Sequence, residues 1–355
     1  MTDWPENDPH NQSNASPGWP PEPGDTEPPD NQSNAAPSIS SEPAHSATQE
    51  LGLIPNGDAG LQEQRSHSEI ESLSPLLFRN YEVPRQPERI PNFGHLGTLV
   101  VLLAFALLLT GLLTQLALAH HFWGVTSRAR AIADIHYTLG TEALLYLFTL
   151  AQCLIVFPLI WHKNFFAGIQ WNGAVAYRLR WRLVSAAVTC LVLALFSSLL
   201  VPGPSNTPID KIFHIPGAPW LLFGFGVTFA PFFEETFFRG FLLPALCTAI
   251  DWIREVVWHE PRLPLGAHDH PQWSLTAMVV AAVATSLPFA LLHAQQTGWS
   301  FGPFILLVGI SIVLCAVRLY TRSLASSVLV HATYNFMLFS IMVIGTQGFR
   351  HLGKL

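Results

Sequence analysis

The stretch Phe232-Phe233-Glu234-Glu235-Thr236-Phe237-Phe238-Arg239-Gly240 decides both the fold and the candidate site. It lies within an otherwise apolar run from Pro219 to Ala249. A charged side chain at the centre of a bilayer costs roughly 2.5–3.5 kcal/mol on insertion scales. Three such groups within six positions therefore indicate a functional site inside a membrane segment.

The composition is that of a membrane protein. Half of the 355 residues are hydrophobic and only 12% are charged, against about 25% in an ordinary soluble domain. The basic residues are scattered singly between apolar runs, which argues against a nucleic-acid partner. The cysteines lie far apart in apolar segments without metal-ligand spacing, so we expect small buried hydrophobes. They are Cys153, Cys190, Cys247 and Cys315.

Apolar runs of about 20 residues, long enough to cross ~30 Å of hydrocarbon, begin at Gly97. Backbone groups in lipid must be satisfied within the segment, so these runs predict helices. We therefore expect an all-α, multi-pass transmembrane bundle of seven helices, or eight if the long fourth run is divided. The runs are 97–119, 141–161, 183–202, 219–248, 274–293, 300–319 and 324–345.

The first 92 residues are rich in Pro, Ser, Asn and Gly. Such a segment buries too little apolar surface to offset its ordering entropy, so we expect a disordered tail. Lys and Arg flank the apolar runs more often on the side that holds the N-terminus. By the positive-inside rule, the sequence predicts an integral membrane protein with a cytoplasmic N-terminus, in the cell membrane if the source is bacterial.

Glu235 and Arg239 are four residues apart, so on a helix they share a face, with the acid in the favourable N-terminal position. Glu234 is rotated by about 100° from Glu235. One glutamate can therefore pair with Arg239 while the other points elsewhere. The carboxylate that does not pair with Arg239 suits general-base catalysis.

Two further motifs place polar groups in apolar runs. His293 follows an apolar run and has Phe289 one turn behind it on the same face. His331 and Asn335 are also four apart, and two stacked donors of this kind suit an oxyanion. Each motif alone is also explained by helix–helix hydrogen bonding or a buried ion pair. Together, a base, two imidazoles and an amide are the inventory of a hydrolytic site.

The three motifs, in this order, resemble the CAAX prenyl endopeptidase and bacteriocin-processing (CPBP, ABI) family of intramembrane proteases. The family pattern is Glu-Glu-x-x-x-Arg, then Phe-x-x-x-His, then His-x-x-x-Asn, and this sequence matches all of it over about residues 185–345. The tail and the first two membrane helices lie outside the resemblance. Composition, hydropathy and the resemblance together divide the chain into the tail at 1–92, membrane helices with a basic loop at 93–182, a protease domain at 183–347 and a short C-terminal tail at 348–355.

The resemblance implies an intramembrane endopeptidase that hydrolyses a peptide bond near the membrane surface. Glu234 and His293 would activate a water, and His331 with Asn335 would stabilise the oxyanion. Glu235, Arg239 and Phe289 would orient these groups. The substrate would be a membrane-associated peptide or protein: prenylated, a bacterial leader peptide or unmodified.

Members of the family have been described as metalloproteases, and Glu234, His293 and His331 would supply a zinc ligand set of two histidines and a glutamate. A metal-free glutamate mechanism uses the same residues. The sequence lacks His-Glu-x-x-His, so the zinc site has no independent support and we expect no cofactor. Other histidines, His259, His268 and His270, lie in a Pro-rich stretch that we interpret as a solvated loop.

One observation fits poorly with a single site: the depth in the membrane at which each site residue lies along its helix. At ~1.5 Å per residue, Glu234 and His331 both fall in the inner half of the membrane, whereas His293 ends its run near the outer face. A kink at Pro288, a steep tilt or a helix that starts well inside the cytoplasm would bring His293 to the others.

Two other functions remain open from the sequence. A non-catalytic membrane interaction or self-immunity protein would retain the same fold and pocket. A transporter would use Glu234 and Glu235 as a proton relay, but the chain lacks the paired, interrupted halves that many transporters have.

Overall fold

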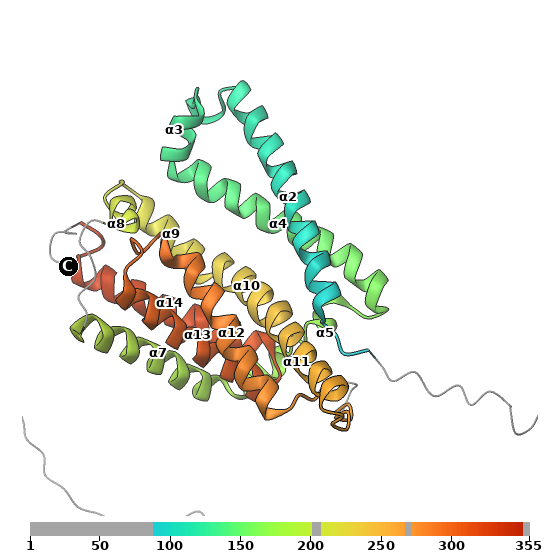
Figure 1. Cartoon of the computed structure of the whole chain (residues 1–355). Helices are drawn as coiled ribbons and strands as arrows, with labels where there is room; N and C mark the ends of the chain where they lie inside the picture. Colours follow the sequence, from blue (N-terminus) through green and yellow to red (C-terminus); the bar gives the residue numbers. More distant parts are fainter. Residues whose placement is uncertain (1–87, 201–206, 267–270, 351–355) are drawn as a thin grey trace, which may run out of the picture. The chain divides into compact units, whose positions relative to one another are not determined.

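The computed structural model describes residues 88–200, 207–266 and 271–350, all within one compact unit (Figure 1). Nearly all of the tail predicted to be disordered lies outside the described residues, as do His268 and His270. Every regular element in the described ranges is helical, which confirms the all-α class.

Six of these helices are long and apolar enough to cross a membrane, and together they confirm a multi-pass helical membrane protein. They correspond to six of the seven expected runs. They are α2 (Phe93–Ala119), α4 (Ile135–Trp161), α7 (Arg180–Leu200), α12 (Leu275–Ala294), α13 (Phe301–Thr321) and α14 (Leu324–Gly345).

Short helices occupy the connections between the long ones. They satisfy backbone groups where the chain turns, often with an Asn, Ser or Thr side chain as N-cap. They are the 3₁₀ turn η1 (Phe122–Gly124), α3 (Arg128–Ala133), α5 (Phe165–Gly168), α6 (Gly173–Arg178) and α8 (Pro208–Phe213).

The long fourth run is helical but interrupted. Pro231 has no N–H, and its ring clashes with the carbonyl of Val227, where the first piece ends. A second irregularity follows the paired glutamates, where one segment is π-helical, a form found mostly at functional sites. The pieces are α9 (Ala218–Val227), α10 (Phe229–Glu235), the π-helical η2 (Thr236–Leu242) and α11 (Leu243–Val257).

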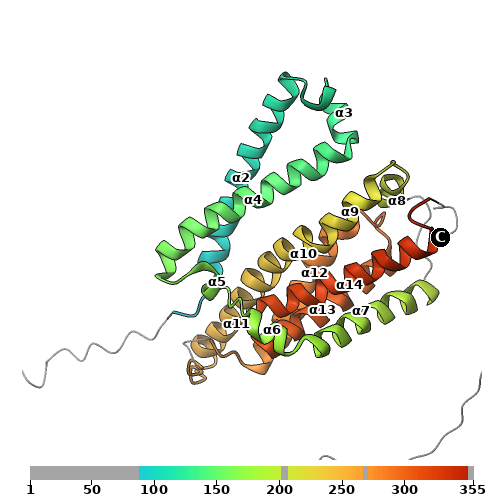
Figure 2. The same ribbon diagram turned by 180° about the vertical axis from the view of Figure 1, so that it is seen from behind.

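Helices α7, α13 and α14 pack closely around a shared core (Figure 2). On α7 the buried positions after Leu183 are the small residues Ala187, Cys190 and Ala194, which let the neighbouring backbones approach. A second cluster joins α11, α12 and α13 through Leu243, Ala281 and other buried residues. The interrupted run therefore lies against the same bundle as α12, α13 and α14.

Aromatic side chains join α4 and α5 to η2. Phe157, Trp161 and Phe165 are buried with Phe241 of η2 in one cluster. Gly168 permits this packing, because a Cβ there would lie 2.2 Å from the Trp161 ring. All four cysteines, at 153, 190, 247 and 315, are buried and free, as the sequence predicts.

Candidate active site

The three motifs come from three separate parts of the chain. Glu234 and Glu235 end α10 and Arg239 follows in η2, while Phe289 and His293 lie near the end of α12. His331 and Asn335 lie in the middle part of α14. Because α12 and α14 both pack beside the interrupted run, the six polar side chains can meet inside the bundle.

An anchor at the other end of α12 sets the depth of His293. Asp251 of α11 accepts hydrogen bonds from the N–H (3.0 Å) and the hydroxyl (2.5 Å) of Ser274, the N-cap of α12. Glu234 lies 17 residues before Asp251, and His293 lies 19 residues after Ser274. At 1.5 Å per residue, both are roughly 26–29 Å from the anchor.

The expected mismatch in depth is thus resolved by where α12 starts. Helix α11 continues to Val257, past the predicted end of the apolar run, and the start of α12 is aligned with Asp251 of α11 and not with the end of that run. Helix α12 itself remains one continuous helix across Pro288.

Glu234 faces both histidines. Its Oε2 lies 3.7 Å from Nε2 of His293 and 3.9 Å from Nε2 of His331. These side chains are 14%, 18% and 7% exposed, respectively, so the site is largely shielded but not sealed. No described residue donates a hydrogen bond to Glu234 Oε2. Both separations exceed hydrogen-bond length and suit a bridging water.

Glu235 is fully buried, and one of its carboxylate oxygens contacts two side chains. Its Oε1 accepts from Nη1 of Arg239 at 2.9 Å and lies 2.9 Å from Nδ1 of His331. Arg239, also fully buried, donates from Nη2 to the Ser311 carbonyl at 3.0 Å and to its hydroxyl at 2.6 Å. The expected pair at positions 235 and 239 is therefore present, and it extends to His331 and α13.

Phe289 forms one wall of this network. The Arg239 guanidinium lies 4.5 Å above the centre of the Phe289 ring, a cation–π contact. The same ring is 4.9 Å from the His293 ring and 6.0 Å from the His331 ring. One aromatic side chain thus spaces the two imidazoles and the guanidinium.

The hydrogen bonds assign the imidazole tautomers. Nδ1 of His293 lies 2.9 Å from the Phe289 carbonyl, which only accepts, so Nδ1 carries the proton. His331 directs Nδ1 at the Glu235 carboxylate in the same way. In the neutral form, both rings therefore present an unprotonated Nε2 towards Glu234.

Asn335 forms a hydrogen bond to a neighbouring helix, α9. Its Nδ2 donates to the Gly226 carbonyl at 2.7 Å. Gly226 belongs to the last turn of α9, where carbonyls lack intrahelical partners. Since an amide carries two N–H donors, one remains for another acceptor.

Several polar contacts of the site have no clear sequence motif. Ser311 is a lone serine in an apolar run, and its role depends on the packing of α13 against η2. On α4, Tyr146 donates to Glu142 at 2.8 Å and stacks on Phe233, the neighbour of Glu234, with the ring centres 4.4 Å apart. In the sequence, the only signal for Glu142 is that it is a single Glu in an apolar run.

The predicted zinc ligands do not form a metal site as they lie here. Glu234, His293 and His331 point at one another, yet no group of three His, Cys, Asp or Glu in the described ranges is arranged to hold a metal ion.

Residues 216–337 match the family model described as type II CAAX prenyl endopeptidase, Rce1-like. The match includes all seven residues of the three motifs. Searches of curated proteins and of solved structures find no match.

Proposed function

We propose that this chain is a membrane protease of the Rce1-like type II CAAX prenyl endopeptidase kind, whose family model residues 216–337 match, and that its site residues cleave a peptide bond as follows. The observation that carries the proposal is the placement of the Glu234 carboxylate between the Nε2 atoms of His293 and His331. The family match makes a peptide or protein in a lipid environment the substrate class.

In the first step, a water lies between Glu234 Oε2 and His293 Nε2, since both atoms are acceptors. Glu234 takes a proton from this water as its oxygen attacks the carbonyl carbon of the substrate. The product is a tetrahedral intermediate with a negative oxygen. Glu234 then passes the proton to the leaving nitrogen, and the carbon–nitrogen bond breaks to give an acid and an amine.

The oxyanion is stabilised by His331 and Asn335. In this step His331 acts as an imidazolium that donates from Nε2, while its Nδ1 stays bonded to Glu235. Asn335 offers the amide hydrogen that Gly226 does not use. Preorganised donors of this kind typically contribute 10²–10³-fold in rate each. Arg239 and Phe289 keep Glu235 and both rings in place.

The direct test is cleavage by Glu234→Gln and His293→Ala. We expect each to lower kcat at least about 100-fold, the scale of general-base catalysis. His120→Ala removes an exposed histidine that is far from the motif residues in the sequence, and it serves as the control. Equal yield and equal unfolding midpoints would show that the variants insert and fold. Undiminished cleavage by either variant refutes the mechanism, whereas absence of cleavage by the folded wild type would favour a non-catalytic interaction protein.

We further infer that the substrate carries a lipid tail. A cavity of about 240 Å³ beside the site is lined by apolar side chains, among them Leu147 of α4 and Phe229, Phe232 and Phe233 of α10. Phe233 directly precedes Glu234, so a tail held there would bring the adjoining peptide to the carboxylate. Matched peptides with and without a prenyl group test this: we expect a lower KM for the prenylated one, and equal KM values would refute it.

Metal dependence needs its own measurement. We propose that cleavage proceeds without a divalent metal, since the acid–base groups are already placed by Glu235 and the Phe289 carbonyl. Activity that survives exhaustive chelation, with metal content measured on the same sample, is the expected result. Loss on chelation and recovery with zinc would require a different mechanism.

A further inference from the structure

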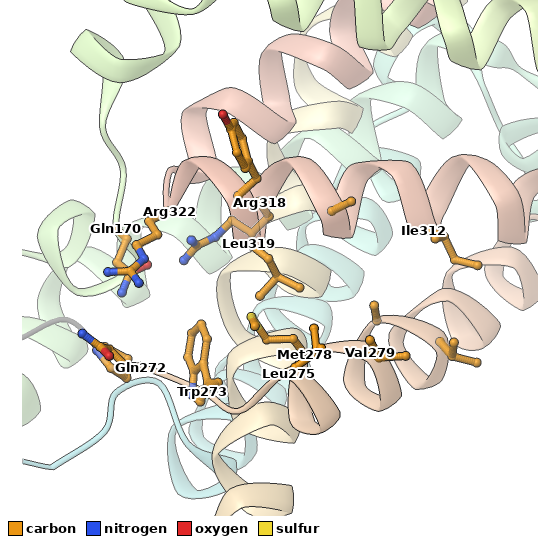
Figure 3. Close-up of a pocket in the computed structure, with 15 residues that line it drawn as sticks. Gln170, Gln272, Trp273, Leu275, Met278, Val279, Ile312, Arg318, Leu319 and Arg322 are labelled. Atoms are coloured by element: carbon orange, nitrogen blue, oxygen red, sulfur yellow. The ribbon is translucent and has the colours of Figure 1, made fainter. Parts of the chain in front are cut away.

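A larger cavity of about 550 Å³ lies between α12 and α13, away from the proposed active site (Figure 3). None of Glu234, His293 and His331 lines it. It lies where α12 begins at Leu275 and α13 ends at Thr321, the level at which apolar span gives way to polar loop. Its volume is that of a small-molecule site.

One end of the cavity is polar and cationic. Figure 3 shows Gln170, Arg318 and Arg322 directed towards the same end, with Gln272 nearby. Arg322 follows the last residue of α13, and no described residue forms a hydrogen bond or ion pair with its guanidinium. No acidic residue is among the described residues that line the cavity. Among the described residues, this end therefore has two positive charges and no anion that balances them.

The rest of the cavity is apolar. Leu275, Met278 and Val279 of α12 line it with Ile312 and Leu319 of α13. Figure 3 shows Leu319 beside Arg318, and Val279 and Ile312 farther along the two helices from the arginines. Trp273 and Tyr320 flank the polar end. Trp and Tyr are enriched at membrane–water interfaces, so the polar end lies at headgroup depth.

We propose that this cavity binds one anionic phospholipid, with its phosphate between Arg318 and Arg322 and an acyl chain between α12 and α13. Basic pockets between transmembrane helices are known to hold anionic headgroups. An isoprenoid tail would fill the apolar part but would leave both guanidinium groups without an anion. The proposal concerns binding and does not depend on the catalytic mechanism.

The lipid would also act on the active-site segment. Arg318 donates from Nε to the Arg239 carbonyl at 3.2 Å and from Nη2 to the Ile169 carbonyl at 3.4 Å. A phosphate that holds Arg318 therefore steadies η2, which carries Arg239. Because the lipid binds only the folded protein, its presence raises the unfolding temperature.

Native mass spectrometry of the full chain, with phosphatidylglycerol or phosphatidylcholine added, tests the site. Arg322→Gln removes one charge from the cavity, and Ala316→Trp fills its apolar wall. Arg178→Gln removes the same charge from an exposed position outside the cavity and is the matched control. The unfolding temperature is measured on the same samples.

We expect wild type and Arg178→Gln to retain one phosphatidylglycerol and to unfold at a higher temperature with it than with phosphatidylcholine. Arg322→Gln should bind it about fivefold more weakly, the contribution of one arginine near an anionic headgroup. Ala316→Trp should lose it.

Equal retention by wild type and Arg322→Gln, or equal retention of the two lipids, overturns the proposal. Ala316→Trp could instead raise the KM for a prenylated peptide, but not for the matched unprenylated one, without any change in bound lipid. That result also overturns the proposal and assigns the cavity to substrate.

Discussion

At the scale of residues, two adjacent glutamates differ because the helix turns by about 100° between them. Glu235 faces the bundle, is fully buried and is held by Arg239 and His331. Glu234 faces the partly exposed space shared by His293 and His331. The pairing at positions 235 and 239 follows from sequence spacing alone. The contacts of Arg239 with Ser311, and of Asn335 with Gly226, depend on tertiary packing that no spacing reveals.

Arg239→Ala should be strongly destabilising. It leaves Glu235 buried without its cation, and breaking a buried pair from one side costs about 3–5 kcal/mol. Denaturant unfolding in mixed micelles measures the change. The exposed Arg178→Ala should stay within about 0.5 kcal/mol of wild type. Equal midpoints for the two variants would contradict the buried network.

Glu235→Gln should test whether Glu235 orients His331 for catalysis, separately from any contribution to folding. The amide keeps the shape of Glu235 but removes the carboxylate that accepts from Arg239 and from Nδ1 of His331. Loss of a residue that orients a catalytic group typically costs about 10–100-fold in activity. We expect that loss in kcat with little change in KM, measured by steady-state cleavage. A change confined to KM would contradict this role for Glu235.

At the scale of elements, the interruption of the fourth run shapes the site. Hydropathy identifies the run but misses its breaks, because Thr228 and the π-helical segment lie among apolar residues. In hindsight Pro231 is the signal, since it cannot support the turn before it. The break frees the Gly226 carbonyl, and α14 supplies Asn335 as its donor. Hydropathy predicts the start of α12 to within one residue but not its depth relative to the fourth run, because the Asp251–Ser274 anchor is a polar contact outside the apolar runs.

Asn335→Ala should weaken the contact between α9 and α14. The Gly226 carbonyl would lose its donor, at a cost of about 1–3 kcal/mol for an unsatisfied buried group. The folded fraction should also show a kcat lower by about 100-fold, since an oxyanion donor is lost. Unfolding and cleavage are measured on one preparation. Reduced stability with an unchanged kcat would restrict Asn335 to holding the two helices together.

At the scale of the whole molecule, hydropathy and three short motifs were enough to predict the membrane bundle and the family, which the six spans and the family match confirm. The side of the membrane on which the N-terminus lies stays a prediction. It depends on the distribution of Lys and Arg between the loops, which the fold itself does not test.

Protease protection tests that orientation. An N-terminal epitope tag should be digested in inside-out vesicles and protected in right-side-out vesicles. A tag after residue 355 should report the topology of the remaining spans. Digestion of the N-terminal tag in right-side-out vesicles would reverse the predicted orientation.

The four native thiols have a practical consequence. All are enclosed by neighbouring helices, so water-borne maleimides should find little to react with in the intact protein. A single cysteine introduced on an exposed loop would then carry a fluorophore or spin label against a silent background. Pairs of such labels at the ends of α9 and α12 would report directly on whether the bundle opens when a peptide enters.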